Sequence, residues 1–236
     1  MQFEQGHIYH IYNQGNGQQR VFFNRENYLY FLTKIWKYVI PYCDVLAYCL
    51  MPNHFHLMVF VNELSIPTNR LGVSPRHTES APMRMNRLGV SPRRTESAPT
   101  KTNRLGVSPR HTESGSKERT LNASIGIMLM SYTKALNKQQ NRTGKLFREE
   151  TKAECINCPN GITPSFYSTK SGIQIHVSDP AKEYPQACFN YIHQNPVKAG
   201  LVSTMDEWEY SSYKDYTGYR KGKLVNKELA ESLGVF

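Results

Sequence analysis

The sequence is poor in cysteine and in long apolar runs. Its five cysteines, at 43, 49, 155, 158 and 188, are an odd number without a framework-like spacing, which argues against a disulfide-stapled secreted fold. No window approaches the roughly 18 uninterrupted apolar residues that a membrane span needs. The start, MQFEQGHIYH, has neither the basic nor the apolar region of a signal peptide. We therefore expect a cytoplasmic protein without membrane contact.

Acidic residues are also scarce relative to basic ones. The chain has 29 Lys and Arg against 19 Asp and Glu, a formal net charge of +10. Such an excess favours nucleic-acid partners, because Lys and Arg that bind phosphates release counterions, and this release favours binding. However, residues 69–114 contain nine Arg/Lys and three Glu, and this segment alone accounts for +6 of the total. The rest of the chain is only mildly basic.

That basic segment is a tandem repeat. NRLGVSPRHTES begins at Asn69, its near-copy NRLGVSPRRTES at Asn86, and NRLGVSPRHTES again at Asn103, so the period is 17 residues. Each unit contains Gly and Pro and offers only Leu and Val for burial, too little apolar surface to offset the entropy of ordering. We predict a disordered insertion over 69–116. A second insertion, a loop, is predicted over about 151–178.

The remaining residues predict one α+β domain spanning 1–236. HIYHIYNQG, CDVLAYCLM, HFHLMVFV and a short KLFRE read as strands. Helical spacing of apolar residues appears from Arg25 to Ile40, with Asn24 as N-cap, and from Leu121 to Leu136. PAKEYPQACFNYIHQNP is expected to form an extra helix that ends before Pro196. This order favours an antiparallel sheet with helices packed on one face.

Two histidines one residue apart interrupt an apolar stretch, YCLMPNHFHLMVF. Side chains alternate across a strand, so His54 and His56 point to one face while Phe55 points to the other, toward the core. Two imidazoles on one face can converge on a metal ion, although partly exposed sheet histidines are the simpler interpretation. An ion that also holds a phosphate would be Mg²⁺ or Mn²⁺, with oxygen ligands completing its shell.

The late helix offers a partner in YIHQNPVKAG. Tyr191 and Asn195 are four residues apart and share a helix face. Together, YCLMPNHFHLMV and YIHQNPVKAGLV resemble the REP-associated tyrosine transposases, a branch of the HUH single-strand nucleases and transposases. HIYNQGNGQQRVFFNRENYLYFL, NRTGKLFRE and WEYSSYKDY extend the resemblance to about two thirds of the chain, whereas 69–116 and 151–178 have no counterpart.

The resemblance implies a ferredoxin-like core, a divalent ion and a single-stranded DNA hairpin as substrate, with the protein acting as a monomer or homodimer. His54 and His56 would be metal ligands and Tyr191 the nucleophile that forms a 5′-phosphotyrosine. Asn195 would be the third ligand, with Gln194 as its nearest substitute. The implied activity is DNA cleavage and strand transfer in transposition.

Other residues support more open interpretations. Arg142, Lys145 and Arg148 cluster near the second helix and Lys198 follows the late one, so they are candidate DNA contacts, although each could be an ordinary solvated cation. The CxxC at 155–158 lacks the four ligands of a structural zinc site and favours free thiols in a loop. A domesticated hairpin-binding protein without strand transfer and an unrelated RNA-binding module are the alternative functions.

Overall fold

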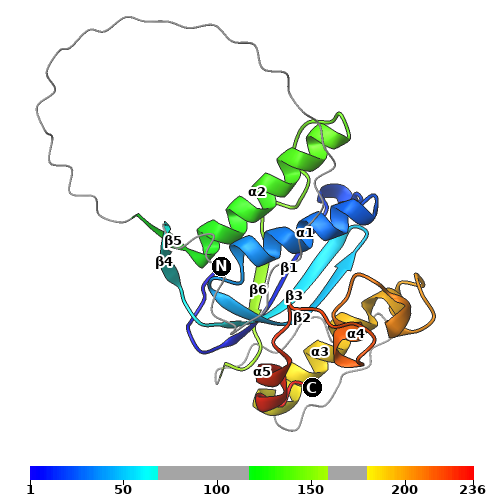
Figure 1. Cartoon of the computed structure of the whole chain (residues 1–236). Helices are drawn as coiled ribbons and strands as arrows, with labels where there is room; N and C mark the ends of the chain where they lie inside the picture. The colour runs from blue at the N-terminus through cyan, green and yellow to red at the C-terminus, as the bar shows by residue number, and fades with distance from the viewer. Residues whose placement is uncertain (69–116, 159–179) are drawn as a thin grey trace, which may run out of the picture.

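The core of the computed structural model is a four-stranded antiparallel sheet. The structure describes residues 1–68, 117–158 and 180–236. The strands β1 (Ile8–Gln14), β2 (Cys43–Met51), β3 (His54–Val61) and β6 (Lys152–Cys155) lie in the order β2-β3-β1-β6 (Figure 1). β1 therefore sits in the middle, antiparallel to both neighbours. This is the strand order of a ferredoxin-like split βαβ sandwich.

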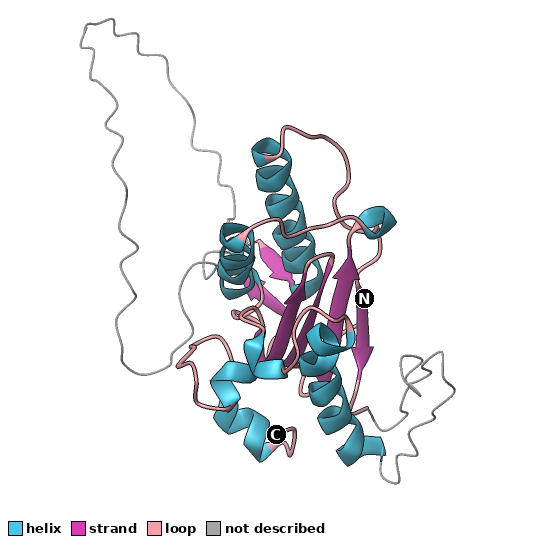
Figure 2. Ribbon diagram, turned by 90° about the vertical axis from the view of Figure 1, so that its right-hand side faces the viewer, coloured by secondary structure: helices cyan, strands magenta, loops and turns pink. Residues whose placement is uncertain are grey.

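Helices cover both faces of this sheet. α1 (Arg25–Tyr38) and α2 (Leu121–Gln139) pack against each other on one face, as the sequence predicted. α3 (Pro180–Lys198), the expected extra helix, lies across β2 and β3 on the opposite face (Figure 2). The short η1 (Asn16–Gln18), η4 (Met205–Glu207), α4 (Tyr213–Tyr216) and α5 (Lys227–Ser232) complete the fold. The predicted α+β antiparallel architecture is confirmed.

Local chemistry explains where the two long helices begin. The Asn24 side chain accepts a hydrogen bond from the Asn27 backbone N–H at 3.1 Å and forms a capping box with it. Thr120 caps α2 in the same way by accepting from the Ala123 N–H at 3.2 Å. The predicted helix starts and the predicted Asn24 cap are therefore confirmed.

An aromatic cluster fills the layer between the sheet and these two helices. The Phe31 ring on α1 lies 5.0 Å from the Phe55 ring on β3 and 5.0 Å from the Tyr132 ring on α2. Phe147 adds a ring 5.9 Å from Phe55. Phe55 is fully buried, which is worth roughly 2–3 kcal/mol of transfer free energy. This packing fixes β3 so that its histidines must face the other way.

Two sequence predictions about the fourth strand are wrong. KLFRE does not form a strand, since only Phe147 makes an isolated bridge, to Gly15. The fourth strand is β6, which lies within the segment predicted as a loop over about 151–178. Its four residues carry too weak an alternation to be recognised alone, and pairing with β1 stabilises them. Residues 159–178 of that predicted insertion lie outside the described residues.

The predicted end of α3 is also wrong. The helix continues through Pro196 to Lys198. Proline removes one N–H donor, but the residues after it still form helical hydrogen bonds. The Ala199 N–H donates to the Asn195 carbonyl at 2.9 Å. Positive φ at Gly200, 67°, then stops the helix.

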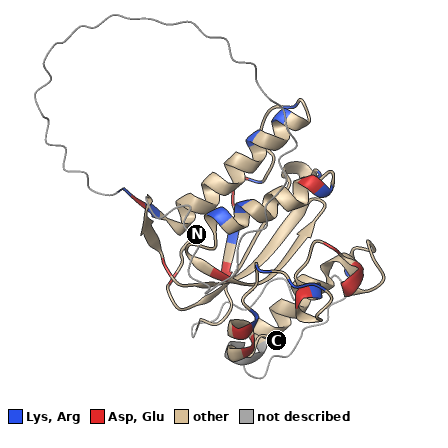
Figure 3. Ribbon diagram, viewed as in Figure 1, with Lys and Arg blue, Asp and Glu red and all other residues tan. Residues whose placement is uncertain are grey.

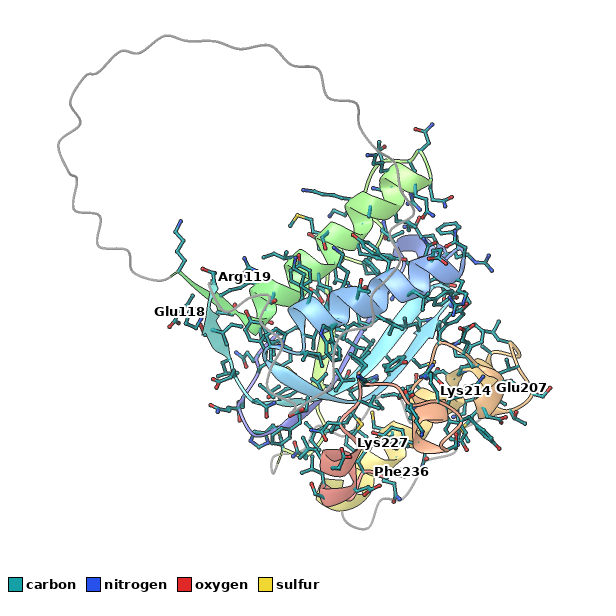
Figure 4. All side chains as sticks on the ribbon, viewed as in Figure 1. Glu118, Arg119, Glu207, Lys214, Lys227 and Phe236 are labelled. Atoms are coloured by element: carbon teal, nitrogen blue, oxygen red, sulfur yellow. A yellow bond between two sulfur atoms is a disulfide. The ribbon has the colours of Figure 1, made fainter. Side chains whose placement is uncertain are left out.

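A small strand pair marks where the first insertion leaves the fold. β4 (Ser65–Pro67) pairs with β5 (Glu118–Thr120), and the Thr68 N–H donates to the Lys117 carbonyl at 2.9 Å. Figure 4 shows Glu118 and Arg119 on this pair, far from the C-terminal helices. The predicted disordered insertion at 69–116 lies outside the described residues, and the single-domain assignment stays a prediction.

The C-terminal segment is bound to the free edge of β2. The Leu50 N–H donates to the Tyr210 carbonyl and the Ser212 N–H to the Tyr48 carbonyl, both at 2.9 Å. Asp215 is 1% exposed and accepts two 2.7 Å hydrogen bonds from the Arg220 guanidinium.

None of the helices in the described ranges combines the length and apolar character that a bilayer crossing demands.

Candidate functional site

A polar cluster occupies the sheet face opposite the aromatic core. In the antiparallel register Tyr12 pairs with His56 and His10 pairs with Glu154, so these four side chains share one face. His54 joins them from the start of β3, and its ring centroid lies 5.0 Å from that of His56. The prediction that His54 and His56 point away from Phe55 to one face is borne out by this register.

Helix α3 places Tyr191 over this cluster. The Tyr191 ring lies edge-on to His56 at a centroid distance of 5.6 Å and to His10 at 6.2 Å. The helix buries Phe189, Ile192 and His193, and Phe189 packs against the Tyr216 and Phe236 rings of the C-terminal segment. Residues more than 130 positions apart in sequence, His54 and Tyr191, are thus brought to one site.

Hydrogen bonds fix the orientation of both histidines of the HxH pair. His10 Nε2 lies 2.9 Å from His56 Nδ1, and the two rings stack at 5.0 Å. His54 Nδ1 lies 2.6 Å from the Asn53 Oδ1, so it carries the proton and leaves Nε2 as the lone-pair nitrogen. The His56 Nε2 is buried and has no hydrogen-bond partner within the described ranges. Such an orphaned nitrogen suits a metal ligand.

Burial keeps these imidazoles neutral. It lowers the pKa of His54 to about 4 and that of His10 to about 3. The pKa of His56 is lowered well below its ordinary value, first by burial and then by the neighbouring His10 and His54. Neutral imidazole is the form that binds metal, so protons do not compete with a metal ion at neutral pH.

Two side chains beside the cluster carry oxygen atoms, but among the described residues Glu154 does not form a group with His54 and His56 in which all ligand atoms lie within 4.8 Å of one another. The Asn195 Nδ2 donates to the Tyr191 carbonyl at 2.9 Å, which directs its Oδ1 elsewhere. Glu154 accepts a 2.7 Å hydrogen bond from the Tyr12 hydroxyl through Oε1, while its Oε2 is buried without a partner in the part of the chain described. Gln194, the predicted substitute for Asn195, is only partly buried on α3.

The nucleophile candidate is a protonated phenol in this environment. Burial is the main cause that raises the pKa of Tyr191, and a side-chain hydrogen bond from Asn195 opposes it. The Lys198 Nζ lies 5.5 Å from the Tyr191 ring centroid. A cation at this distance can stabilise negative charge that develops beside the ring.

Three predicted DNA contacts lie at one rim of the sheet. The Arg142 Nη2 donates to the Gln19 Oε1 at 2.7 Å, and the Arg148 N–H donates to the Gln14 carbonyl at 2.8 Å. Lys145 pairs with Glu149 at 3.3 Å, but both side chains are largely exposed, so the pair is weak. Figure 3 shows basic residues, in blue, on α2 toward this end of the molecule.

The same rim adjoins the histidine pair. The Gly15 N–H donates to the Asn53 carbonyl at 2.7 Å, so the loop after β1 touches the turn that precedes His54. The Gln19 Nε2 reaches the Leu146 carbonyl at 2.8 Å, which ties that loop to the basic segment. The basic segment, the loop and the β2–β3 turn therefore form one continuous edge.

The sequence interpretation missed three members of the cluster. His10 and Tyr12 alternate along the first predicted strand, and that period could have placed them beside the HxH pair. Glu154 carries no such signal, because the sequence predicts a loop for the segment that contains it. Only the pairing of β6 with β1 brings its carboxylate to this face.

The CxxC differs from its prediction. Cys155 and Cys158 form a disulfide, so the prediction of free thiols at these two positions is wrong for this structure. The other three cysteines, Cys43, Cys49 and Cys188, are free and buried.

Comparisons with known proteins place few limits on the chain. No protein-family model matches it, and no curated protein matches it either. One solved structure that it resembles is that of a REP-associated tyrosine transposase bound to a REP hairpin. The match covers 96% of this chain and 92% of that one, with 12% sequence identity and a TM-score of 0.47.

Proposed function

We propose that this protein is a metal-dependent enzyme that cleaves single-stranded hairpin DNA and rejoins it through a phosphotyrosine link. The observation that carries this proposal is the convergence of the HxH pair and Tyr191 on one face, with 5.6 Å between the His56 and Tyr191 rings. The quoted motifs support it, because a nucleophile and two imidazole ligands are the parts that this chemistry requires.

The residues present fit a divalent ion. His54 and His56 would each offer Nε2, and Asn195 would offer an oxygen, a mixed set that suits Mg²⁺ or Mn²⁺. When bound, the ion would polarise the scissile phosphate and offset its developing charge. His10 would act as a positioning residue: by accepting the His56 Nδ1 proton, it would hold the tautomer in which Nε2 is the ligand.

Tyr191 would act as the nucleophile. Its hydroxyl oxygen would form a bond to phosphorus as the bond from phosphorus to the 3′ oxygen breaks, leaving a 5′-phosphotyrosine and a free 3′-hydroxyl. The phenolic proton would pass to solvent or to the departing oxygen. The Lys198 ammonium lies near enough to stabilise the negative charge at this point. Attack by a second 3′-hydroxyl on the same phosphorus would release Tyr191 and rejoin the strand.

The continuous edge formed by the basic segment, the loop after β1 and the β2–β3 turn would position the DNA. Arg142, Lys145 and Arg148 would contact backbone phosphates, which fix the register of a nucleic acid without reading its sequence. Because this edge adjoins the turn before His54, a strand bound there would lead directly to the histidine pair. The more phosphates these residues contact, the more steeply the DNA affinity would fall as the salt concentration rises.

The test is a covalent-adduct assay. The protein is incubated with single-stranded hairpins from the flanks of its own gene, with Mn²⁺ or with EDTA, and then denatured and resolved on a gel. We expect a slower-migrating protein–DNA species with Mn²⁺ that Tyr191→Phe abolishes while hairpin binding persists. Tyr219→Phe is the matched control, because Tyr219 is 75% exposed and belongs to a loop outside the site.

An adduct of full strength in Tyr191→Phe would contradict the assignment. Hairpin binding by the unmodified chain without any adduct would instead support a DNA-binding protein that has lost strand transfer. Preference for RNA over the hairpin in a competition assay would favour the RNA-binding alternative.

A further inference from the structure

A second group of metal-ligating side chains lies outside the site described above. His7, Cys155 and Cys158 each offer one ligand atom, and these atoms all lie within 4.8 Å of one another. It is the one group of three or more His, Cys, Asp or Glu side chains with that spacing in the residues described. Donors of a single tetrahedral zinc ion, with bonds of about 2.0–2.3 Å, are roughly 3.5–4 Å apart. Small side-chain rotations would therefore bring all three to one ion.

The backbone around this group is held in place from two sides. The Ile8 N–H donates to the Asn157 Oδ1 at 2.8 Å, and the Ile156 N–H donates to the Ile8 carbonyl at 2.9 Å. The residue after His7 is thus bound to both residues between the two cysteines. Cys155 itself is 8% exposed and ends the edge strand β6.

The His7 ring is oriented as a ligand would be. Its Nδ1 is buried and has no hydrogen-bond partner in the described part of the chain, and its Nε2 lies 3.7 Å from the Glu4 carboxylate. At 3.7 Å the exposed Glu4 carboxylate makes an electrostatic contact with Nε2 rather than a hydrogen bond, and its charge favours a proton on that nitrogen. The unpartnered nitrogen is thus the one free to bind.

We propose that the reduced Cys155–Cys158 pair forms a zinc site with His7. Reduction by a dithiol breaks the S–S bond, and two electrons and two protons convert it into two thiols. Binding of Zn²⁺ then releases both thiol protons, so two thiolates and one neutral imidazole hold the ion and a water occupies the fourth position. The disulfide is the oxidised, metal-free form of the same site.

Zinc binding by the reduced thiols would tie down one edge of the sheet that carries the proposed active site. Within the described residues, β6 is a four-residue strand at the edge of the sheet, and its neighbour there is β1. A zinc ion at its end would fasten it to the residue just before β1. Glu154 precedes Cys155 and lies opposite His10, so the same strand would present its carboxylate to the polar cluster. The zinc proposal does not depend on the proposed DNA chemistry.

Cobalt substitution tests the proposal with a spectroscopic signal. Full-length protein is reduced with a phosphine, freed of metal and titrated with Co²⁺ under anaerobic conditions. We expect thiolate-to-cobalt charge-transfer absorption and tetrahedral ligand-field bands, both displaced by one equivalent of Zn²⁺ per chain. The His54–His56 site has no sulfur ligand, so it cannot produce the charge-transfer band.

Variants separate the ligands from the rest of the fold. Cys155→Ser and Cys158→Ser should lose the charge-transfer band, and His7→Gln should weaken Zn²⁺ binding by at least tenfold. Cys43→Ala is the matched control, since Cys43 is a buried thiol outside the group. Zn²⁺ should also raise the melting temperature of the reduced chain but not that of Cys158→Ser.

Three results would overturn the proposal. These are reduced wild-type protein without the charge-transfer band, a band that persists in both serine variants, and unchanged Zn²⁺ affinity in His7→Gln. Loss of the band in Cys43→Ala with a normal melting curve would equally count against the assigned ligands.

Discussion

Replacement of His10 by Phe tests whether this buried residue orients a metal ligand. The ring would still stack on His56, but the 2.9 Å hydrogen bond that the His56 Nδ1–H donates to His10 Nε2 would be lost. Loss of such an outer-shell partner lowers metal affinity by about 10–100-fold, which is roughly 1.4–2.8 kcal/mol. That range agrees with the cost of about 1–3 kcal/mol for leaving a buried N–H unsatisfied.

The assay is the Mn²⁺ dependence of adduct formation. We expect the Mn²⁺ concentration at half-maximal adduct to rise about 10–100-fold in His10→Phe, with the maximal yield at saturating Mn²⁺ largely recovered. His10→Gln, whose amide oxygen can accept the His56 proton, should restore much of the affinity. Because His10→Phe also removes a buried hydrogen bond, its melting temperature must be compared with that of a control.

Tyr132→Phe supplies that control. It removes the 2.8 Å hydrogen bond from the Tyr132 hydroxyl to the Val21 carbonyl, which is equally buried but lies on the opposite face of the sheet. Both variants should be destabilised to a similar extent, and only His10→Phe should shift the Mn²⁺ midpoint. An unchanged midpoint in His10→Phe, or an equal shift in Tyr132→Phe, would refute the positioning role.

Three further predictions concern the framework around the site. Asp215→Asn should lower the free energy of unfolding by about 2–3 kcal/mol, less than for a fully buried pair because the Arg220 side chain is 30% exposed. Chemical denaturation measures it, and an unchanged midpoint would be the contrary result. Gly15→Ala would place a Cβ 2.1 Å from the Gln19 carbonyl oxygen, so the loop that contacts the turn before His54 would have to shift. Adduct formation should then slow about tenfold to a hundredfold, and a wild-type rate would contradict this. Burial lowers the pKa of His193 to about 3 from 6.5, so the unfolded state binds more protons between these values and stability falls as the pH drops below about 6.5. Metal-free melts at pH 7.5 and pH 5 should show this decrease, and equal melting temperatures would exclude it.

Much of the fold could be predicted from the periodic spacing of apolar residues, because each element buries one face against the core. The apolar spacing of α1 and α2 and the alternation around Phe55 reflect direct contact with one core. Asn24 was recognisable as a cap because its side chain satisfies backbone donors within its own first turn. In each case the determining contacts are either local in sequence or repeated along one element.

The errors occur where long-range contacts decide the structure. β6 forms because β1 provides a pairing edge, a partner more than 130 residues away that four residues of sequence do not reveal. The same dependence hid Glu154 and the meeting of His7 with the CxxC. Pro196 predicts a helix end, yet the helix continues because the backbone N–H groups that follow it donate to carbonyls of the preceding turn.

The position of α3, the helix that carries the proposed nucleophile Tyr191, depends on the C-terminal segment as well as on the sheet. His193 Nε2 lies 2.8 Å from the Ser212 hydroxyl, and both residues are buried. The Ser212 N–H in turn donates to the Tyr48 carbonyl on β2. Tyr191 is therefore linked through its own helix and this bond to the strand that pairs with β3. Since β3 carries the histidine pair, the two halves of the proposed site share one rigid support, which is the preorganisation that in-line attack on a phosphate requires.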